Sequence, residues 1–237
     1  LAAIMLIGMM VVSACAVSYN DLTDKDQIVN KDAVSMLVSL GIIEGKPDGS
    51  YGPTENVDRA QMAKMLSVIM NKGVDNSALY QSVNSGLTDI TSHWAKGHIN
   101  YCYTTGIIAG RGNGKFDPSA TVTALEAAKM LLVAVGYDPA IEGFEGADWA
   151  INVSVRADEQ GIFEGFTKDL SAPLNRDDAA LLIYNALDVE MIQSYTTNNY
   201  PIVYSDHRTI LSDKYGVIKV EGVVTANEWA ILDDDTD

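Results

Sequence analysis

Two arginines lie where helices are expected to begin, a position that is electrostatically unfavourable for a cation. Arg59 and Arg176 each follow a capping residue, so each cation meets the positive end of a helix dipole at a cost of roughly 0.3–1 kcal/mol. The position is explained if the guanidinium joins exposed backbone N–H groups in holding an anion. The alternative is a surface ion pair with a nearby acid such as Asp58 or Asp177. The residues alone leave both interpretations open.

Two tryptophans are the next candidates for contact with a ligand. Trp94 and Trp149 each precede a Gly-Ile pair by 12 residues. Such a ring either stacks on the face of a sugar or fills the core at the start of a helix, and position does not separate the two roles. Lys96 is either a second cation near the loop of Asp89 or a solvated side chain.

Catalytic and metal-binding patterns are absent from the sequence. It contains no nucleophile elbow, P-loop, zinc-helix motif or dinucleotide fingerprint. Composition leaves a glycosidase-like carboxylate pair open, but nothing selects one. His93 and His98 are five residues apart and do not share a helical face at metal-ligand spacing. We expect this chain to be a binding protein rather than an enzyme, with no cofactor and no metal.

The net charge argues against two classes of partner. The 237 residues include 32 acidic and 16 basic side chains, for a formal charge of −16. A general nucleic-acid binder needs a basic surface that displaces counterions from phosphates. Docking on an anionic membrane by charge alone also needs a basic surface. Hydrophobic residues make up 47% of the chain, which is enough for a sizeable core.

The first 16 residues predict export. Residues 1–12 are almost purely apolar, and Ser13-Ala14-Cys15-Ala16 follows, as in the apolar region and cleavage site of a signal peptide. The segment is too short to span a bilayer, and it lacks an initiator Met and a basic start, so we expect it to be clipped. Cleavage near Val17 is one interpretation. The other is a lipoprotein box with a lipidated Cys15.

An internal repeat organises the rest of the chain. Three segments of the form Gly-Ile-(Ile or Phe)-x-Gly begin at Gly41, Gly106 and Gly161. Each first glycine is followed after 12 residues by a proline, and two copies carry an acid 17 residues before it, at Asp24 and Asp89. The first copy has Val29 where the other two have tryptophan. Agreement at several fixed offsets predicts tandem copies of one unit.

Each copy is expected to form a helix, a tight turn and a second helix. The first glycine is typical of the left-handed residue that ends a helix. Asp48-Gly49 and Asn113-Gly114 predict the turn, since both dipeptides tolerate positive φ. The second helix starts with a capping signature in each copy, at Asp58–Gln61, Thr123–Glu126 and Asn175–Asp178.

The order of these motifs resembles the S-layer homology family. The second copy shows it most fully, with Leu87-Thr88-Asp89-Ile90, His93-Trp94-Ala95, Gly106-Ile107-Ile108-Ala109-Gly110, Phe116-Asp117-Pro118 and Val122-Thr123-Ala124-Leu125-Glu126. The resemblance implies a mainly α fold, in which three tandem helix-loop-helix repeats form a pseudo-threefold bundle. It also implies that grooves between repeats bind secondary cell-wall polysaccharide, which often carries a pyruvate ketal.

The resemblance also assigns roles and boundaries. It implies polysaccharide contacts for seven residues: Arg59, Arg176, Trp94, Trp149, Asp24, Asp89 and Lys96. Ala124 replaces the arginine in the second copy, so the groove built around it is expected to be weak. We expect a signal peptide at 1–16, repeats at 20–73, 86–138 and 145–190, a linker at 191–208 and the start of a truncated β-rich domain at 209–237.

Three functions remain open from the sequence. The first is non-covalent anchoring of an exported protein to the cell wall, with a partner polysaccharide attached to peptidoglycan. The second is a wall-tethered polysaccharide hydrolase whose catalytic part lies beyond residue 237. The third is an S-layer subunit that self-assembles through that further region. All three predict a secreted protein of the cell wall and surface.

Overall fold

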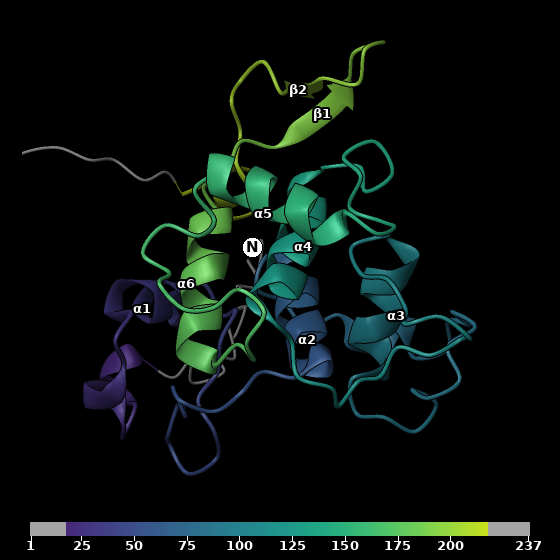
Figure 1. Cartoon of the computed structure of the whole chain (residues 1–237). Helices are drawn as coiled ribbons and strands as arrows, with labels where there is room; N and C mark the ends of the chain where they lie inside the picture. The colour runs from purple at the N-terminus through teal and green to yellow at the C-terminus, as the bar shows by residue number, and fades with distance from the viewer. Residues whose placement is uncertain (1–17, 218–237) are drawn as a thin grey trace, which may run out of the picture.

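The computed structural model describes residues 18–217 and shows a mainly helical chain (Figure 1). The expected signal peptide lies outside the described residues. The longer helices are α1 (Lys31–Ser39), α2 (Arg59–Met70), α3 (Lys96–Thr104), α4 (Ala124–Val135), α5 (Trp149–Glu159) and α6 (Arg176–Ala186). Short 3-10 segments are at Tyr19–Asp21, Lys25–Gln27 and Ser77–Tyr80. No helix in this part of the chain is long and apolar enough to cross a membrane.

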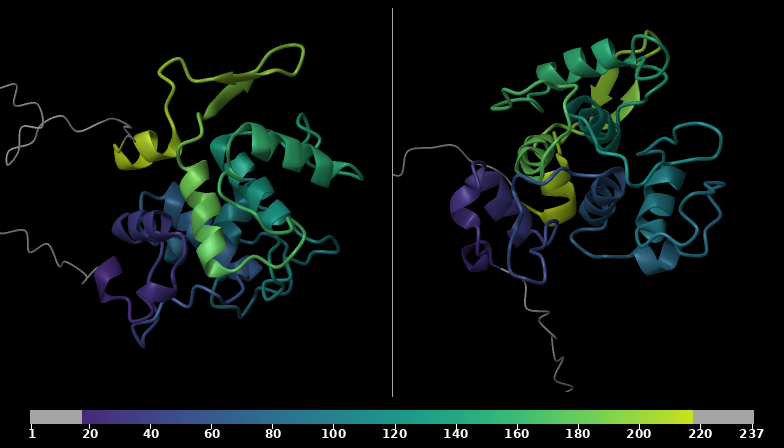
Figure 2. Two further views of the ribbon diagram at one scale, coloured as in Figure 1. Left: turned by 60° about the vertical axis from the view of Figure 1, so that its left-hand side comes forward. Right: turned by 60° about the horizontal axis from the view of Figure 1, so that its bottom comes forward.

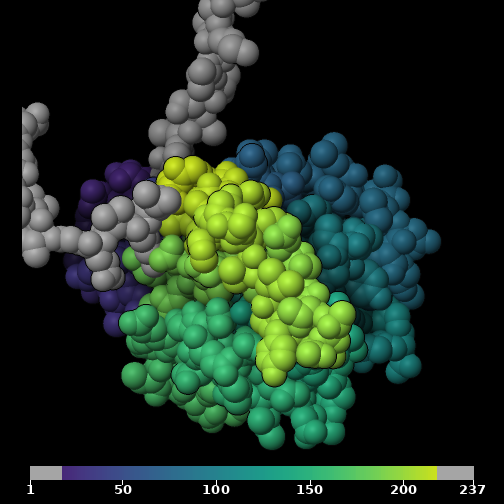
Figure 3. Space-filling view, turned by 90° about the horizontal axis from the view of Figure 1, so that it is seen from above, coloured from purple at the N-terminus to yellow at the C-terminus, as the bar shows by residue number. Residues whose placement is uncertain are grey.

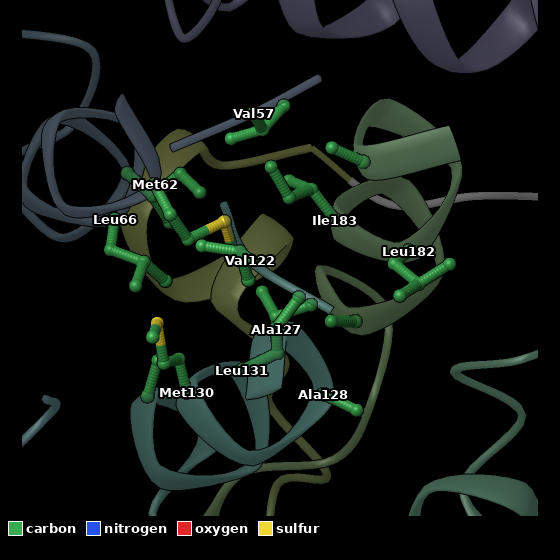
Figure 4. Packing of buried hydrophobic residues seen from close by; sticks show 14 of the residues in the cluster. Val57, Met62, Leu66, Val122, Ala127, Ala128, Met130, Leu131, Leu182 and Ile183 are labelled. Carbon is green, nitrogen blue, oxygen red and sulfur yellow. The ribbon is translucent and has the colours of Figure 1, made fainter. Parts of the chain in front are cut away.

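The helices pair between copies rather than within them. Helix α1 packs on α6, α3 packs on α2, and α5 packs on α4. Each first helix of a copy therefore lies on the second helix of another copy. Helices α2, α4 and α6 lie between the other three in Figure 1. Their facing side chains form the centre of the core, where Met62, Val122, Leu131 and Ile183 converge (Figure 4).

A ring of three backbone hydrogen bonds lies just before the second helices. The Val57 N–H donates to the Leu174 carbonyl at 2.8 Å, and the Leu174 N–H donates to the Val122 carbonyl at 2.8 Å. The Val122 N–H closes the ring on the Val57 carbonyl at 2.9 Å. All three residues are buried. The ring pairs backbone groups that would otherwise be unsatisfied at the centre of the molecule.

Helix ends follow the signals in the sequence. Gly41, Gly106 and Gly161 have φ of 70°, 80° and 69°, the left-handed conformation expected after a helix. Helices α2 and α4 begin with complete capping boxes, whereas α6 has only the half in which Asn175 accepts from the Asp178 N–H. These local signals therefore set where the loops between helices start and stop.

The segment after α6 differs from the expected linker. Strands β1 (Ile192–Tyr195) and β2 (Pro201–Val203) form an antiparallel hairpin, which stands at one end of the helices in Figure 2. The Tyr195 hydroxyl donates to Glu142 at 3.0 Å and accepts from the Asp138 N–H at 2.9 Å. Ile192 is buried. These tertiary contacts, which a local polarity pattern does not reveal, hold residues 192–203 as a hairpin.

The expected β-rich segment begins with a helix instead. Helix α7 (Ile210–Tyr215) starts at a capping box of Thr209 and Ser212 and ends at the left-handed Gly216. The Tyr215 hydroxyl donates to the Ile69 carbonyl of α2 at 3.2 Å. In Figure 3 this C-terminal segment, in yellow, lies across one end of the helices. The β-rich domain expected over 209–237 thus has a helix in its described part, and its residues from 218 lie outside the described residues.

Candidate functional site

Two grooves on the helical surface bring the predicted ligand contacts together. Groove 1 has a volume of about 300 Å³ and contains both Trp94 and Arg176. Its other lining residues are Ile42, Ile43, Glu44, Gly45, Lys46, Pro47, Tyr51, Val57, Gln61, Lys64 and Met65. Groove 2 has a volume of about 360 Å³ and contains both Trp149 and Arg59. Its other lining residues are Ile107, Ala109, Gly110, Arg111, Glu126, Lys129, Met130, Phe144, Glu145 and Gly146.

The two grooves use equivalent positions of the repeating unit. The loop and second helix of one copy form the main wall, with Lys64 in groove 1 and Lys129 in groove 2 at the same offset from the first glycine. The tryptophan comes from the following copy. The arginine comes from the first residue of another second helix. Each groove therefore needs side chains from three segments that lie far apart in the sequence.

Arg59 is buried beneath groove 2, and two of its nitrogens donate hydrogen bonds to backbone carbonyls. Its side chain is 4% exposed, and the guanidinium carbon lies 4.4 Å from the centre of the Phe116 ring. Its Nε donates to the Phe116 carbonyl at 2.9 Å and its Nη2 donates to the Ala109 carbonyl at 2.8 Å. Burial, followed by the nearby Arg111 charge, lowers the pKa of Arg59 to about 10, so it stays charged at neutral pH. The surface ion pair with Asp58 is not what holds this arginine.

Arg176 occupies the equivalent position in groove 1 but keeps free donor capacity. It lies 4.7 Å from the centre of the Tyr51 ring and is half-buried. Its Nη2 reaches the Glu44 carbonyl at only 3.4 Å. Its Nε is the one buried side-chain nitrogen or oxygen among the described residues without a hydrogen-bond partner. A buried donor without a partner is unfavourable for stability.

The two predicted aspartates hold loops in place. Asp24 accepts from the N–H groups of Tyr51 and Gly52 at 2.7 and 2.8 Å. Asp89 accepts from the equivalent N–H groups of Phe116 and Asp117, at 3.0 and 2.8 Å. Both carboxylates are thus already engaged with the loop that carries the aromatic ring beneath an arginine. Burial raises the pKa of Asp89, but these backbone hydrogen bonds outweigh it and keep the pKa below its usual value.

The tryptophans differ in exposure, and Lys96 lies elsewhere. Trp94 is 56% exposed at the edge of groove 1. Trp149 is half-buried, and the Lys129 ammonium lies 5.8 Å from its ring centre. Lys96 is the first residue of α3 and lines neither groove as the described residues form them. The structure therefore brings four of the seven predicted residues into grooves and places Asp24, Asp89 and Lys96 outside them.

Both grooves are also lined by cations that sequence analysis did not select. Lys46 pairs with Glu55 beside groove 1, and the equivalent Arg111 pairs with Glu126 at 2.6 Å in groove 2. Lys64 pairs with Glu44 at 2.8 Å. These cations recur at the same offsets in the first two copies, so a comparison of the copies position by position would have found them.

The equivalent third position lacks these side chains. Ala124 replaces the arginine and is buried, and Val29 replaces the tryptophan and is 81% exposed. Leu181 replaces the lysine of α2 and α4. The hollow near this place is lined by Phe163, Phe166, Lys168 and neighbouring residues, and Lys168 pairs with Asp178. It therefore offers neither the guanidinium nor the indole of the other two grooves.

The histidines do not form a metal site in the part of the chain that the structure describes. His98 is buried, its Nδ1 lies 2.6 Å from the Ser67 hydroxyl, and its Nε2 lies 3.6 Å from the Asp75 carboxylate. The His93 ring instead accepts from the Ala95 N–H at 3.2 Å. No group of three or more potential metal ligands occurs among residues 18–217.

Comparison with known proteins identifies the repeating unit. The model of the S-layer homology domain matches residues 18–63 and 86–128. Two stretches of this chain are thus S-layer homology segments. They supply the main walls of grooves 1 and 2, whereas the third copy, expected at 145–190, lies outside both matches.

Similar proteins come from bacterial surfaces. The chain is 31% identical to a "Cell surface protein" of Thermoanaerobacter kivui over 94% of its own length and 27% of that protein. It is 33% identical to an "S-layer protein" of Bacillus licheniformis over 48% of its length and 12% of that protein. It is 29% identical to the "Middle cell wall protein" of Brevibacillus brevis over 68% of its length and 15% of that protein.

The matches place the protein at the bacterial surface. The S-layer homology segments and these relatives indicate a cell-surface protein that is associated with the cell wall. The chain spans about a quarter or less of the length of these relatives. The similarity therefore concerns one part of each relative, and most of each relative has no counterpart in this chain.

Proposed function

We propose that this chain anchors an exported protein to the cell wall by non-covalent binding of secondary cell-wall polysaccharide in grooves 1 and 2. The observation that carries the proposal is the repeated grouping of an indole, a guanidinium laid on an aromatic ring, and a lysine. Trp94, Arg176 and Lys64 form this group in groove 1. Flat indole surfaces bind sugar rings by stacking, and fixed donors bind hydroxyl and carboxylate oxygens.

The proposal includes a pseudo-threefold arrangement of three repeats over residues 18–190. The closed ring formed by Val57, Leu174 and Val122 supports it, because each residue belongs to a different copy and makes the same two contacts. The exchange of helices between copies supports it further. In this arrangement two junctions carry binding grooves, and the third, at Ala124, is silent.

The cargo of the anchor is a separate question. A wall-tethered hydrolase and a lattice-forming S-layer subunit both fit a chain that spans about a quarter or less of its relatives. For residues 18–217 we propose a binding role, because the side chains that converge in the grooves suit recognition of a polymer. The polymer holds the protein at the wall in either case.

Sedimentation with purified cell walls tests the proposal. Walls of Thermoanaerobacter kivui are prepared in two forms, intact and extracted with aqueous hydrogen fluoride, which cleaves the phosphodiester links of wall polymers. The full chain should sediment with intact walls and remain in solution with extracted walls. The released polysaccharide should compete for binding. Equal sedimentation with both wall preparations would contradict the proposal.

A further inference from the structure

The segment after α6 contacts the C-terminal ends of the second helices. The clasp is defined as residues 191–217, which include the hairpin and α7. Its Ile192 backbone lies on the end of α4, where a methyl group on Gly136 would be 2.7 Å from the Ile192 carbonyl oxygen. Its Leu211 N–H donates at 2.9 Å to the carbonyl of Leu187, the residue that ends α6. The clasp is thus fastened to the second and third copies.

The clasp also reaches the first copy. The Tyr215 hydroxyl donates to the Ile69 carbonyl, near the end of α2, at 3.2 Å. Ile210 and Leu211 of α7 are 1% and 0% exposed, so both side chains belong to the core. Their burial stabilises the clasp beyond its polar contacts. A segment that leaves the third copy therefore ends on the first copy, and its contact with α2 joins residues 146 apart in sequence.

Grooves 1 and 2 lie toward the other end of these helices. Helices α2 and α4 have 12 residues each, which makes each about 18 Å long. Their groove residues all fall in the first two turns, and they are Gln61, Lys64 and Met65 in α2 and Glu126, Lys129 and Met130 in α4. The clasp contacts the opposite end. The polymer proposed for the grooves and the chain beyond residue 217 therefore attach to opposite ends of the same helices.

The contact between Leu211 and Leu187 determines how tension on the chain would enter the bundle. Tension applied beyond residue 217 first reaches α7. It passes from there to α6 through Leu187 and to α2 through Tyr215, so residues 188–210 are bypassed. Contacts that are loaded in parallel share the force. Without the clasp, the whole force would enter at the end of α6 and pull this helix away from α1 and α4, on which it packs.

Loss of α6 from the bundle would also damage the proposed binding site. Arg176 is the first residue of α6 and lines groove 1. Leu174, just before α6, donates to the Val122 carbonyl and accepts from the Val57 N–H in the backbone ring. Peeling of α6 would therefore remove a groove residue and open the ring at the same time.

We propose that the clasp has a mechanical function: it carries tension on the chain beyond residue 217 into α2 and α6 together and keeps α6 on the bundle. The inference rests on the proposed function, because the tension is that of a cargo on an anchor whose grooves hold the polymer. It adds that retention under load depends on residues outside both grooves. Loss of a clasp contact therefore shortens retention under load and leaves retention without load unchanged.

Optical tweezers on the full chain measure this load path without a polymer. One handle is attached at Ser119→Cys, an exposed position in the loop before α4, and the other at the C-terminus. The chain carries Cys15→Ser, and the remaining Cys102 is buried. The test variant is Tyr215→Phe, which removes only the hydroxyl that bonds to α2. Its matched control is Tyr200→Phe, which removes a hydroxyl from a 69% exposed tyrosine of the same clasp.

The expected result depends on where the load enters. The wild type should open in one step, with no earlier lengthening. At constant load, Tyr215→Phe should shorten the lifetime of the closed bundle about fivefold, as expected for loss of one neutral hydrogen bond, and Tyr200→Phe should not. When the C-terminal handle is moved to Ser18→Cys, the load bypasses the clasp, and Tyr215→Phe should have the lifetime of the wild type. Without load, both tyrosine variants should sediment with intact walls as the wild type does.

Two results would contradict the inference and leave the anchor proposal intact. A first step on the order of 80 Å at low load in the wild type would show that residues 188–210 are drawn out before the bundle opens. An equal loss of lifetime in Tyr215→Phe at both handle positions would show that Tyr215 only stabilises the fold. If the chain instead shows the expected load path but does not sediment with intact walls, the anchor proposal is wrong and the mechanical function of the clasp is supported.

Discussion

The guanidinium of Arg176 lies 4.7 Å from the centre of the Tyr51 ring. The Tyr51 hydroxyl in turn donates a 2.7 Å hydrogen bond to the Arg176 carbonyl, across 125 residues of sequence. Arg59 and Phe116 repeat the stacking between the first and second copies, at 4.4 Å. Two of the three junctions are thus joined by an arginine laid on an aromatic ring, a favourable contact for a partly desolvated cation.

The two arginines should respond differently to truncation. Arg59→Ala leaves the buried Phe116 carbonyl and the Ala109 carbonyl without their donor, so the free energy of unfolding should fall by about 1–3 kcal/mol. Arg176→Ala removes a contact of 3.4 Å and should lower it by about 1 kcal/mol or less. Retention of Arg176→Ala on cell walls should nevertheless fall at least about tenfold. Urea unfolding and wall sedimentation measure the two effects.

Arg208→Ala is the matched control for both variants. The Arg208 side chain is 39% exposed, pairs with Asp206 and lines neither groove. Its loss should leave stability and retention near wild type. If Arg59→Ala loses wall retention while its unfolding free energy is unchanged, then Arg59 contacts the ligand directly. The structural role given to its buried hydrogen bonds would then be wrong.

Asp89 should stabilise the loop of the second copy in its ionised form. Backbone hydrogen bonds from Phe116 and Asp117 hold its pKa below the usual value. A depressed carboxyl pKa stabilises the fold above the unfolded-state pKa, about 4, and this stabilisation is lost as the pH falls through the folded-state pKa. Asp89→Asn should therefore cost about 1–3 kcal/mol at neutral pH and less at acid pH.

Urea unfolding at pH 7 and at pH 3 provides the measurement for Asp89. The control is Asp26→Asn, which removes an exposed carboxylate and should change stability little at either pH. A cost for Asp89→Asn that is the same at both values of pH would show that the charge of Asp89 does not hold the loop.

His98 should make stability fall on mild acidification. Burial lowers its pKa, although the Asp75 carboxylate raises it. The unfolded chain then binds a proton more readily than the folded one, so this contribution is complete above about pH 6.5 and is lost as the pH falls below it. Val153 fills the equivalent buried place in the third copy, so His98→Val is a natural substitution. It should flatten the pH dependence of urea unfolding between about pH 7 and pH 5.

A steeper pH dependence in His98→Val than in the wild type would contradict the assignment. Ser67→Ala serves as a partial variant, since it removes the hydroxyl 2.6 Å from the His98 ring but keeps the titrating group. It should retain the acid sensitivity that His98→Val loses.

Local signals in the sequence predicted the helix ends and part of the site. The left-handed Gly41, Gly106 and Gly161 and the capping residues Asp58 and Thr123 act through their immediate neighbours, so their spacing sufficed. The repeated tryptophans and the arginines at helix starts, together with the family resemblance, selected four residues that line the grooves.

Other features depend on contacts between distant residues. Arg59 is buried because the Ala109 and Phe116 carbonyls of another copy receive its donors, and nothing near Arg59 in the sequence indicates this. Asp24 and Asp89 were expected to contact the ligand. Their carboxylates instead accept hydrogen bonds from backbone N–H groups 27 residues away. The hairpin at 192–203 likewise depends on a contact with the segment between the second and third copies, through Tyr195 and Glu142.

The most direct test of the central claim is wall retention of tryptophan variants. Trp94→Ala and Trp149→Ala should each reduce sedimentation with intact walls, and the double variant should remain in solution with unchanged helical circular dichroism. Val29→Ala, at the equivalent exposed place of the third junction, should sediment as the wild type does. If the double tryptophan variant sediments like the wild type, or if Val29→Ala is lost from walls to the same degree, the two-groove anchor is contradicted.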